Sequence, residues 1–391
     1  MGRIIIFTGK GGVGKTSTAA AHAVKAAKAG KKTLIVSTDM AHNLSDIFMR
    51  EVREDPIEIM ENLDCLEIDS NYEMNRHYEH ISAAFKNMMA FKSEEDSETF
   101  EDIVVFPGIE ELFSLLRIKE VYDTGAYDLI IVDCAPTGET LSLLKFPELF
   151  SWYMEKLFPI GKVAMKVLRP ISKSVFKLDM PDSKAMNDIE KLYVKLGELQ
   201  GLLKDRDICS IRLVTIPEKM VVEETKRNYM YMNLYNFNVD GLYINRIIPD
   251  DIDNKFFDRW KLIQGNYLNE LEAAFYNIPT YKIKWYEVDI NGIEGLDRIV
   301  EDSLRDENIF EVNKKVESET FEKTDTGYRL KVYVPFTNKQ DFDLLESGTD
   351  IIIKIGNFKR NIPIPNVIRK YSVRSAKFEA EALCIDFVIK E

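Results

Sequence analysis

The chain has 391 residues, of which 45% are hydrophobic and 30% charged, and its 65 acidic and 52 basic side chains give a formal net charge of −13. This length indicates two or three domains, with enough core to fold without disulfides or structural metals. The net acidity argues against nucleic-acid binding, because affinity for phosphate backbones comes mostly from a surplus of lysine and arginine.

The first fifty residues alternate between apolar strands and an alanine-rich helix. Residues 4–7 predict a buried strand, a glycine-rich turn follows, and residues 17–29 and 33–37 predict a helix and a second strand, forming one βαβ unit. The run at residues 4–7 is far shorter than a signal-peptide core or the ~20 residues of a membrane span. We therefore expect a soluble, cytoplasmic protein.

Further apolar runs are typical of a parallel sheet that is covered on both faces. They lie at residues 129–132, 211–215 and 241–244, with helical segments between them. Right-handed crossovers place the residues that follow each strand at the same, C-terminal edge of such a sheet. The sequence thus predicts an α/β fold in which four side chains meet at one edge: Lys10, Asp39, Asp133 and Asn245.

Two stretches do not fit this alternation, namely residues 72–113 and 152–178. The second has apolar residues at the three-and-four spacing of a helix, with lysines between them, and its prolines and Gly161 divide it into short helices. Amphipathic helices packed on the domain would explain both stretches. An exposed apolar groove, rich in methionine because Met adapts to varied partners, would explain them equally well.

The sequence pattern changes near residue 305. Residues 306–326 are rich in charge and are interpreted as a linker, and residues 327–391 alternate between apolar and polar side chains with turn signals between the runs. This pattern predicts a small antiparallel β-sandwich. Because Ile351, Ile352 and Ile353 are consecutive, at least one of them should face away from the core, and Pro363 and Pro365 indicate an edge strand.

One segment satisfies the phosphate-binding pattern G-x-x-x-x-G-K-[ST], directly after a strand and at the start of a helix: Gly9-Lys10-Gly11-Gly12-Val13-Gly14-Lys15-Thr16. The glycines let backbone N–H groups surround phosphates, Lys15 reaches the β- and γ-phosphates, and the Thr16 hydroxyl is offered to Mg²⁺. We predict an ATP site with Mg²⁺ as cofactor, formed by Gly9, Gly11, Gly12, Val13, Gly14, Lys15, Thr16, Ser17, Pro217 and Asn245.

Lys10 is a second lysine inside this loop and is typical of the deviant P-loop subclass. In that subclass two subunits face each other, and each supplies this lysine to the other's nucleotide, as an arginine finger does in phosphoryl transfer. Membership of the subclass implies a homodimer whose assembly is coupled to ATP binding.

A resemblance to one family extends beyond the loop. Residues 37–46, and residues 133–140 with 143–147, resemble the two switch segments of the arsenite-pump and tail-anchored-protein-targeting ATPases. The segment Thr215-Ile216-Pro217-Glu218 and the strand ending at Asn245 are similar too. The resemblance covers about residues 1–305. Residues 327–391 resemble the small-heat-shock (α-crystallin-like, or HSP20-like) domain that some bacterial and plastid members carry.

The resemblance implies roles for individual residues. Asp39 corresponds to the carboxylate that orients the attacking water and acts in catalysis together with Lys10 and Lys15. Asp133 corresponds to the carboxylate that holds Mg²⁺ through water, so the expected metal-site residues are Thr16, Asp39 and Asp133. Asn245 corresponds to the residue that reads the adenine edge.

This chain also differs from the family. It has Met40 where the family usually has proline, Glu139 where it has histidine and Ser142 where it often has arginine, so the coupling of the switches is not fixed by the resemblance. The cysteine pair by which eukaryotic targeting enzymes share a zinc across their dimer is missing. We therefore expect no zinc.

The favoured interpretation is a homodimeric chaperone or targeting factor that hydrolyses Mg-ATP. Its ATPase domain would span residues 1–305, with helical insertions at about 72–113 and 150–207 that form a groove for hydrophobic or tail-anchored client segments. A transient membrane receptor is a further partner that this interpretation allows.

Two alternatives remain open. The catalytic subunit of an arsenite efflux pump would need several thiolates at one As(III) and usually two ATPase halves, whereas this chain has one P-loop and four scattered cysteines. A partition or septum-positioning ATPase would tend to end in a membrane-seeking helix or to carry a basic DNA-binding face.

The wide spacing of the four cysteines predicts neither a redox pair nor a zinc site, and it fits a reducing compartment.

Overall fold

The computed structural model describes most of the chain. The described residues are 2–39, 43–52, 55–70, 72–73, 109–135, 138, 144, 183–313, 317–337, 342–347 and 349–389. Most of the expected groove insertion 72–113, residues 150–182 of the insertion 150–207, and Met40, Glu139 and Ser142 lie outside them. Residues 183–207 are described, and apolar side chains among them, such as Leu192 and Leu196, are buried in the core instead of lining an exposed groove. For the rest of both insertions, the expected client groove stays a prediction.

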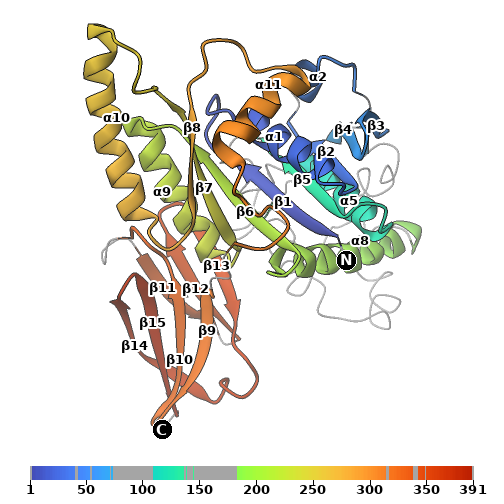
Figure 1. Cartoon of the computed structure of the whole chain (residues 1–391). Coiled ribbons are helices and arrows are strands. Elements are labelled where there is room, and N and C mark those ends of the chain that lie inside the picture. Colours follow the sequence, from blue (N-terminus) through green and yellow to red (C-terminus); the bar gives the residue numbers. More distant parts are fainter. Residues whose placement is uncertain are drawn as a thin grey trace, which may run out of the picture.

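The P-loop unit, which runs from β1 to the π-helical turn η1, alternates strands and helices (Figure 1). Its strands are β1 (Arg3–Thr8), β2 (Thr33–Ser37), β3 (Ile57–Met60), β4 (Leu63–Glu67), β5 (Leu129–Asp133), β6 (Cys209–Thr215), β7 (Val239–Ile247) and β8 (Thr280–Lys284). Its helices are α1 (Lys15–Lys28), α2 (Asn43–Phe48), α5 (Ile109–Asp123), α8 (Ser183–Lys204), α9 (Lys219–Leu234), α10 (Lys255–Ala274), α11 (Gly292–Ile299) and η1 (Val300–Leu304).

These strands form one mostly parallel sheet. In the described part of the chain its order is β3-β4-β2-β5-β1-β6-β7-β8, with β3 and β4 paired antiparallel. The registers of β1 and β2 bring their C-terminal residues Phe7 and Ser37 beside Asp133, at the end of β5. The predicted α/β fold is confirmed, and the strands that the sequence pattern missed, β3, β4 and β8, extend the sheet at its two edges.

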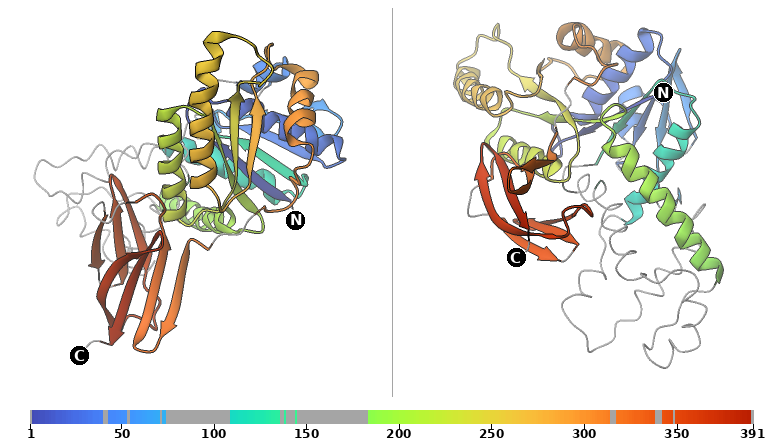
Figure 2. Two further views of the ribbon diagram at one scale, coloured as in Figure 1. Left: turned by 60° about the vertical axis from the view of Figure 1, so that its left-hand side comes forward. Right: turned by 90° about the horizontal axis from the view of Figure 1, so that it is seen from below.

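Helices cover both faces of the sheet (Figure 2), and alternate side chains of the central strands belong to two different core clusters. Ile5 and Ile131 belong to the cluster that includes α1 and α11, whereas Ile4 and Ile130 belong to the cluster that includes α5, α8 and α9. Burial on both faces explains why these strands are continuous apolar runs in the sequence. None of the described helices combines the length and apolar composition needed to cross a bilayer.

The C-terminal residues form the predicted antiparallel sandwich. Its sheets have the orders β14-β15-β10-β9 and β11-β12-β13. Ile351 and Ile353 are buried in the core, whereas Ile352 is only partly buried on the other face of β12, and β13 is an edge strand as the prolines indicated. The strands are β9 (Glu319–Thr324), β10 (Gly327–Tyr333), β11 (Phe342–Ser347), β12 (Asp350–Ile355), β13 (Phe358–Pro363), β14 (Tyr371–Glu379) and β15 (Ala382–Ile389).

The expected linker at residues 306–326 is corrected by the structure. Its last third contains β9, which pairs antiparallel with β10, and its first third contains the buried residues Glu307 and Ile309. The many charged residues of this segment suggested a linker exposed to solvent. However, β9 is an edge strand, and an edge strand can carry many charged side chains without leaving the sheet.

The sandwich docks on α9 of the P-loop unit. The rings of Tyr231 and Phe358 lie with centroids 3.8 Å apart, and the Tyr235 hydroxyl donates to the Lys359 carbonyl at 2.9 Å. Arg360 donates to the last carbonyl of α9. These contacts lie along the edge strand β13, and apolar side chains of both units belong to one continuous cluster.

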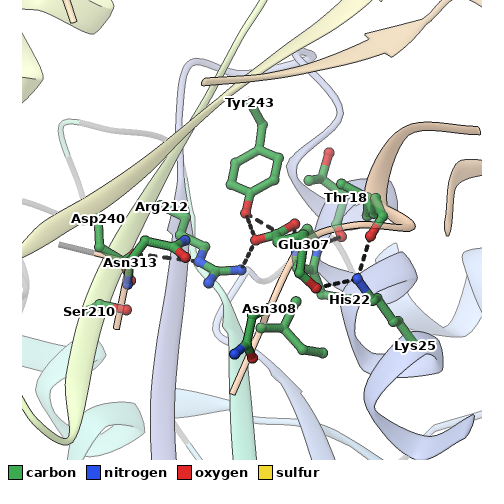
Figure 3. Close-up of polar contacts among 12 residues, drawn as sticks. Thr18, His22, Lys25, Ser210, Arg212, Asp240, Tyr243, Glu307, Asn308 and Asn313 are labelled. Carbon is green, nitrogen blue, oxygen red and sulfur yellow. Dashed lines mark hydrogen bonds and ion pairs between the residues drawn. The ribbon is translucent and has the colours of Figure 1, made fainter. Parts of the chain in front are cut away.

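A buried group of charges fastens residues 305–313, the connector segment, to the P-loop unit (Figure 3). The Glu307 carboxylate accepts hydrogen bonds from Arg212 Nη1 at 2.7 Å and from the Tyr243 hydroxyl, and His22 Nε2 lies 3.0 Å from its other oxygen. Burial alone would raise the pKa of Glu307, but His22 and Arg212 outweigh burial and lower it from 4.5 to about 2. The carboxylate is therefore held in its charged form.

A second contact point lies further along the connector segment. Arg3 donates to the Ile309 carbonyl at 2.6 Å and pairs with Asp240 at 2.8 Å, and the Asn313 amide donates to the same carboxylate at 3.1 Å. The connector segment thus contacts β1, β6, β7 and α1. By its contacts it is part of the P-loop unit.

Candidate nucleotide site

The phosphate-binding loop lies between β1 and α1, at the C-terminal edge of the sheet (Figure 1). Gly12 and Gly14 have φ angles of 78° and 91°, in the left-handed region that glycine alone adopts without strain. A Cβ atom at Gly14 would also lie 2.1 Å from Asn245 Nδ2. Glycine is therefore required at position 12 by the backbone conformation, and at position 14 by both the backbone and the contact with Asn245.

A cavity of about 500 Å³ opens above this loop, a volume typical of ligand sites. Several of the predicted site residues line it: Gly11, Gly12, Gly14, Lys15, Thr16, Ser17 and Asp39. The buried Val13 and the predicted Pro217 and Asn245 are outside this lining. The structure thus brings together the loop and the first switch carboxylate, as the sheet topology predicted.

The two lysines of the loop are in different environments. Lys15 is 7% exposed, and its Nζ donates to the Lys10 carbonyl at 3.4 Å. The Lys10 side chain is one-third exposed, and its Nζ lies 3.5 Å from the Glu224 carboxylate on α9. Lys15 is directed into its own loop, whereas Lys10 is at the loop's outer side.

Asp133 lies next to the loop and is buried. The Thr16 hydroxyl donates to its Oδ2 at 2.7 Å, and its Oδ1 has no hydrogen-bond partner among the described residues. Burial raises the pKa of Asp133 to about 7, although the Thr16 hydrogen bond and Lys15 act in the opposite direction. Because the folded pKa lies above 3.8, this carboxyl favours folding at low pH, and that contribution is lost as pH rises through 7.

Asp39 follows β2 at the rim of the cavity. Its amide donates to Ser37 Oγ at 3.1 Å, and Asn43 Nδ2 lies 3.5 Å from its Oδ2. The preceding amide, that of Thr38, donates to the Asp133 carbonyl at 3.1 Å. Asp39, just after β2, and Asp133, at the end of the neighbouring β5, are therefore held near each other, and the negative charge of Asp39 contributes to the raised pKa of Asp133.

Asn245 ends the regular part of β7 and contacts the loop itself. Its Nδ2 donates to the Val13 carbonyl at 2.9 Å, and its Oδ1 accepts from the Arg246 amide at 2.8 Å. Its side-chain amide is thus engaged with protein groups. Pro217 is buried just after β6.

Sequence reasoning missed several polar residues that line the cavity: Asn43, Asp46, Arg246, Asp289 and Asn291. Two of these lie within the first switch motif, and Arg246 directly follows Asn245, so adjacency to predicted residues was a usable signal for them. Residues 289 and 291 belong to no recognised motif, and only the fold of the segment after β8 brings them to the loop.

Comparisons with known proteins show which family the chain belongs to. The family described as Anion-transporting ATPase matches residues 2–304, and the family described as HSP20-like domain found in ArsA matches residues 325–387. The chain is 32% identical over 393 residues to "Putative arsenical pump-driving ATPase 1" of Aquifex aeolicus, covering 98% of this chain and 99% of that protein.

Two further relatives match most or all of the chain. "Putative arsenical pump-driving ATPase" of Chlorobaculum tepidum is 33% identical over 396 residues, 100% of this chain and 96% of that protein. "ATPase ASNA1 homolog 1" of Paramecium tetraurelia is 30% identical over 311 residues, 78% of this chain and 93% of that protein. The chain therefore belongs to the anion-transporting ATPase family, as an ATP-hydrolysing enzyme with a C-terminal HSP20-like domain.

Proposed function

We propose that this ATPase acts as a homodimeric, magnesium-dependent chaperone or targeting factor, which holds hydrophobic, tail-anchor-like segments and releases them when ATP is hydrolysed. The proposal rests on the family, on the resemblance of both switch segments to targeting ATPases, and on the arrangement of charged groups around the loop. The observation that carries it over the pump alternative is the burial of all four thiols.

In this proposal each group at the loop acts on a different part of the nucleotide. Lys15 contacts the β- and γ-phosphates, since its side chain lies within the loop that would enclose them. Asp39 accepts a hydrogen bond from the attacking water, because it is the carboxylate that lines the cavity after β2. Asn245 lies near the loop, where it would meet the adenine edge if its amide were released.

The residues around Asp133 fit a magnesium ion. Mg²⁺ prefers hard oxygen ligands, and the Thr16 hydroxyl, the Asp133 carboxylate and the Asp39 carboxylate supply them. The Asp133 oxygen that lacks a hydrogen-bond partner among the described residues would accept from a metal-bound water. The ion would neutralise charge on the phosphates, and binding it would favour the ionised form of Asp133, whose pKa burial raises to about 7.

Lys10 supports the homodimer. It lies at the outer side of the loop, and its Nζ is 3.5 Å from Glu224 in the single chain. An exposed ion pair of this kind is worth little, about 1 kcal/mol at most, so a nucleotide phosphate in a facing subunit can replace it. ATP would then bring two chains together through a contact that neither chain can complete alone.

The thiols are poorly suited to binding arsenite. Cys65, Cys134, Cys209 and Cys384 are all buried and lie on or beside four different strands. Burial raises the pKa of Cys209 to about 12, and that of Cys65 still further, which disfavours the thiolate that binds As(III). The reducing, cytoplasmic location expected from these cysteines, and the membrane receptor, stay predictions.

The alternative is an ATPase that drives an arsenical pump. It is favoured by the printed names of the Aquifex and Chlorobaculum relatives, which match over nearly the whole chain. Membership of the anion-transporting ATPase family disfavours the partition or septum-positioning alternative.

Two measurements on the full chain separate these functions. In the first, ATP turnover is measured with and without arsenite; a targeting factor should show no stimulation, whereas a pump ATPase should be stimulated. In the second, capture of a fluorescent apolar helical segment is measured with ATP and with ADP, using Asp39→Asn to hold the ATP state. The absence of any nucleotide-dependent capture would contradict the proposed function.

A further inference from the structure

The end of β7 is tied to the phosphate-binding loop by one side chain. Asn245 Nδ2 donates to the Val13 carbonyl at 2.9 Å, while its Oδ1 accepts from the Arg246 amide at 2.8 Å. The contact is close enough that Gly14 has no room for a Cβ atom beside Nδ2. Both ends of the amide are therefore used inside the protein.

This hydrogen bond sets the orientation of a peptide plane. In a planar trans peptide the carbonyl of one residue and the N–H of the next point in opposite directions. Holding the Val13 carbonyl toward Asn245 therefore directs the Gly14 N–H to the other side of the loop. Gly14 lines the cavity, where backbone N–H groups are the donors that a polyphosphate needs.

A second side chain holds the first one in place. Gln264 of α10 is 9% exposed; its Oε1 accepts from the Ile248 amide at 3.0 Å and its Nε2 donates to the Arg246 carbonyl at 3.1 Å. Arg246 has a φ angle of 54°, an unfavourable conformation for a residue with a side chain. Gln264 thus stabilises the turn that presents the Arg246 amide to Asn245.

We propose that Asn245 and Gln264 are positioning residues for phosphate binding, which form a hydrogen-bonded relay from α10 through the Arg246 backbone to the Val13 carbonyl. The relay orients the Gly14 N–H before the ligand arrives. Asn245 then contributes to the binding of any polyphosphate, with or without a base. The inference concerns polyphosphate binding alone, so its failure is distinct from failure of the client-holding function.

The test uses ligands that differ in the base. Affinities for ATP, GTP and inorganic tripolyphosphate, with magnesium present throughout, are measured by calorimetry for the wild-type full chain and for Asn245→Ala, Asn245→Asp and Gln264→Leu. Asn245→Asp keeps the acceptor and the shape but places a carboxylate against the Val13 carbonyl. The matched control is Asn357→Ala, in the exposed turn between β12 and β13.

We expect Asn245→Ala to lower the affinity for all three ligands by a similar factor of about two to ten, which is the range for loss of one neutral hydrogen bond. Asn245→Asp should lower these affinities further, and Gln264→Leu should also lower them. Asn357→Ala should leave them unchanged. The fitted stoichiometry of each titration reports the folded fraction of the variant, so loss of folded protein is separated from loss of affinity. Tripolyphosphate affinity at the wild-type value in both Asn245 variants would overturn the inference and leave Asn245 as a reader of the base alone.

Discussion

Replacing Glu307 by glutamine should destabilise the P-loop unit by about 3 kcal/mol. The pKa of this carboxyl falls from 4.5 to about 2 on folding, and at about 1.4 kcal/mol per pH unit the difference corresponds to roughly 3 kcal/mol. Glutamine keeps the shape of the side chain but leaves the fully buried Arg212 with Asp240 as its one remaining carboxylate partner among the residues that the structure describes. Loss of one member of a buried ion pair typically costs about 3–5 kcal/mol, which agrees with this value.

The effect has a defined dependence on pH. Because the folded pKa of Glu307 is lowered, its contribution is fully present above pH 4.5 and is lost as pH falls toward 2. The difference in stability between wild type and Glu307→Gln should therefore begin to shrink as pH falls below 4.5.

Unfolding of the full chain in urea, followed by tryptophan fluorescence, measures this effect on the right part of the molecule. All three tryptophans precede residue 305, so the signal reports on the P-loop unit and not on the sandwich. The control is Glu311→Gln, which removes the same charge from the same segment. Arg3 binds the backbone carbonyl of Glu311, and the substitution leaves that carbonyl in place. If Glu307→Gln and Glu311→Gln have equal stability at pH 7, the argument from the buried charges is wrong.

The remaining predictions concern the nucleotide site. Asp39→Asn should bind ATP nearly as well as wild type but should lower turnover by about 100-fold or more in a phosphate-release assay, and normal turnover would remove Asp39 from its proposed role. Lys15→Ala should weaken ATP binding by about tenfold or more, measured by calorimetry, since a hydrogen bond to a charged group is lost. The affinity for Mg²⁺ should rise about tenfold per pH unit below pH 7 and level off above it, because the ion displaces the proton of Asp133; Asp133→Asn should show weak, pH-independent binding. Lys10→Ala should remain a monomer by light scattering when an ATP analogue converts the wild-type chain to a dimer, and a wild-type chain that stays monomeric would defeat the trans-lysine role.

Most of the sheet could be predicted because its central strands are buried on both faces. Residues 4–7, 33–37 and 129–132 are continuous apolar runs, and the structure places them side by side. The edge strands β3 and β8 were missed, since they face solvent on one side and their side chains are partly polar. The same reasoning explains why β9 was interpreted as a linker.

The site divides in a similar way. The loop was identified because its glycines and lysine are close together in the sequence, and each of these residue types has a local role in binding phosphate. The buried charges around Glu307 were missed because their members are far apart in the chain, although one signal was present. Arg212 lies inside an apolar strand run, and Asp240 directly precedes another. An isolated charge there would be very costly, so a buried partner of opposite charge was to be expected.

The docking of β13 on α9 has a consequence for folding during synthesis. An uncovered edge strand exposes unpaired backbone groups and promotes association between chains. Domains generally form in the order in which they leave the ribosome, so α9 is in place before the sandwich is complete. The first unit of each molecule thus acts as an intramolecular template for its second, and a sandwich produced alone, without residues 1–305, would present β13 to its neighbours and self-associate.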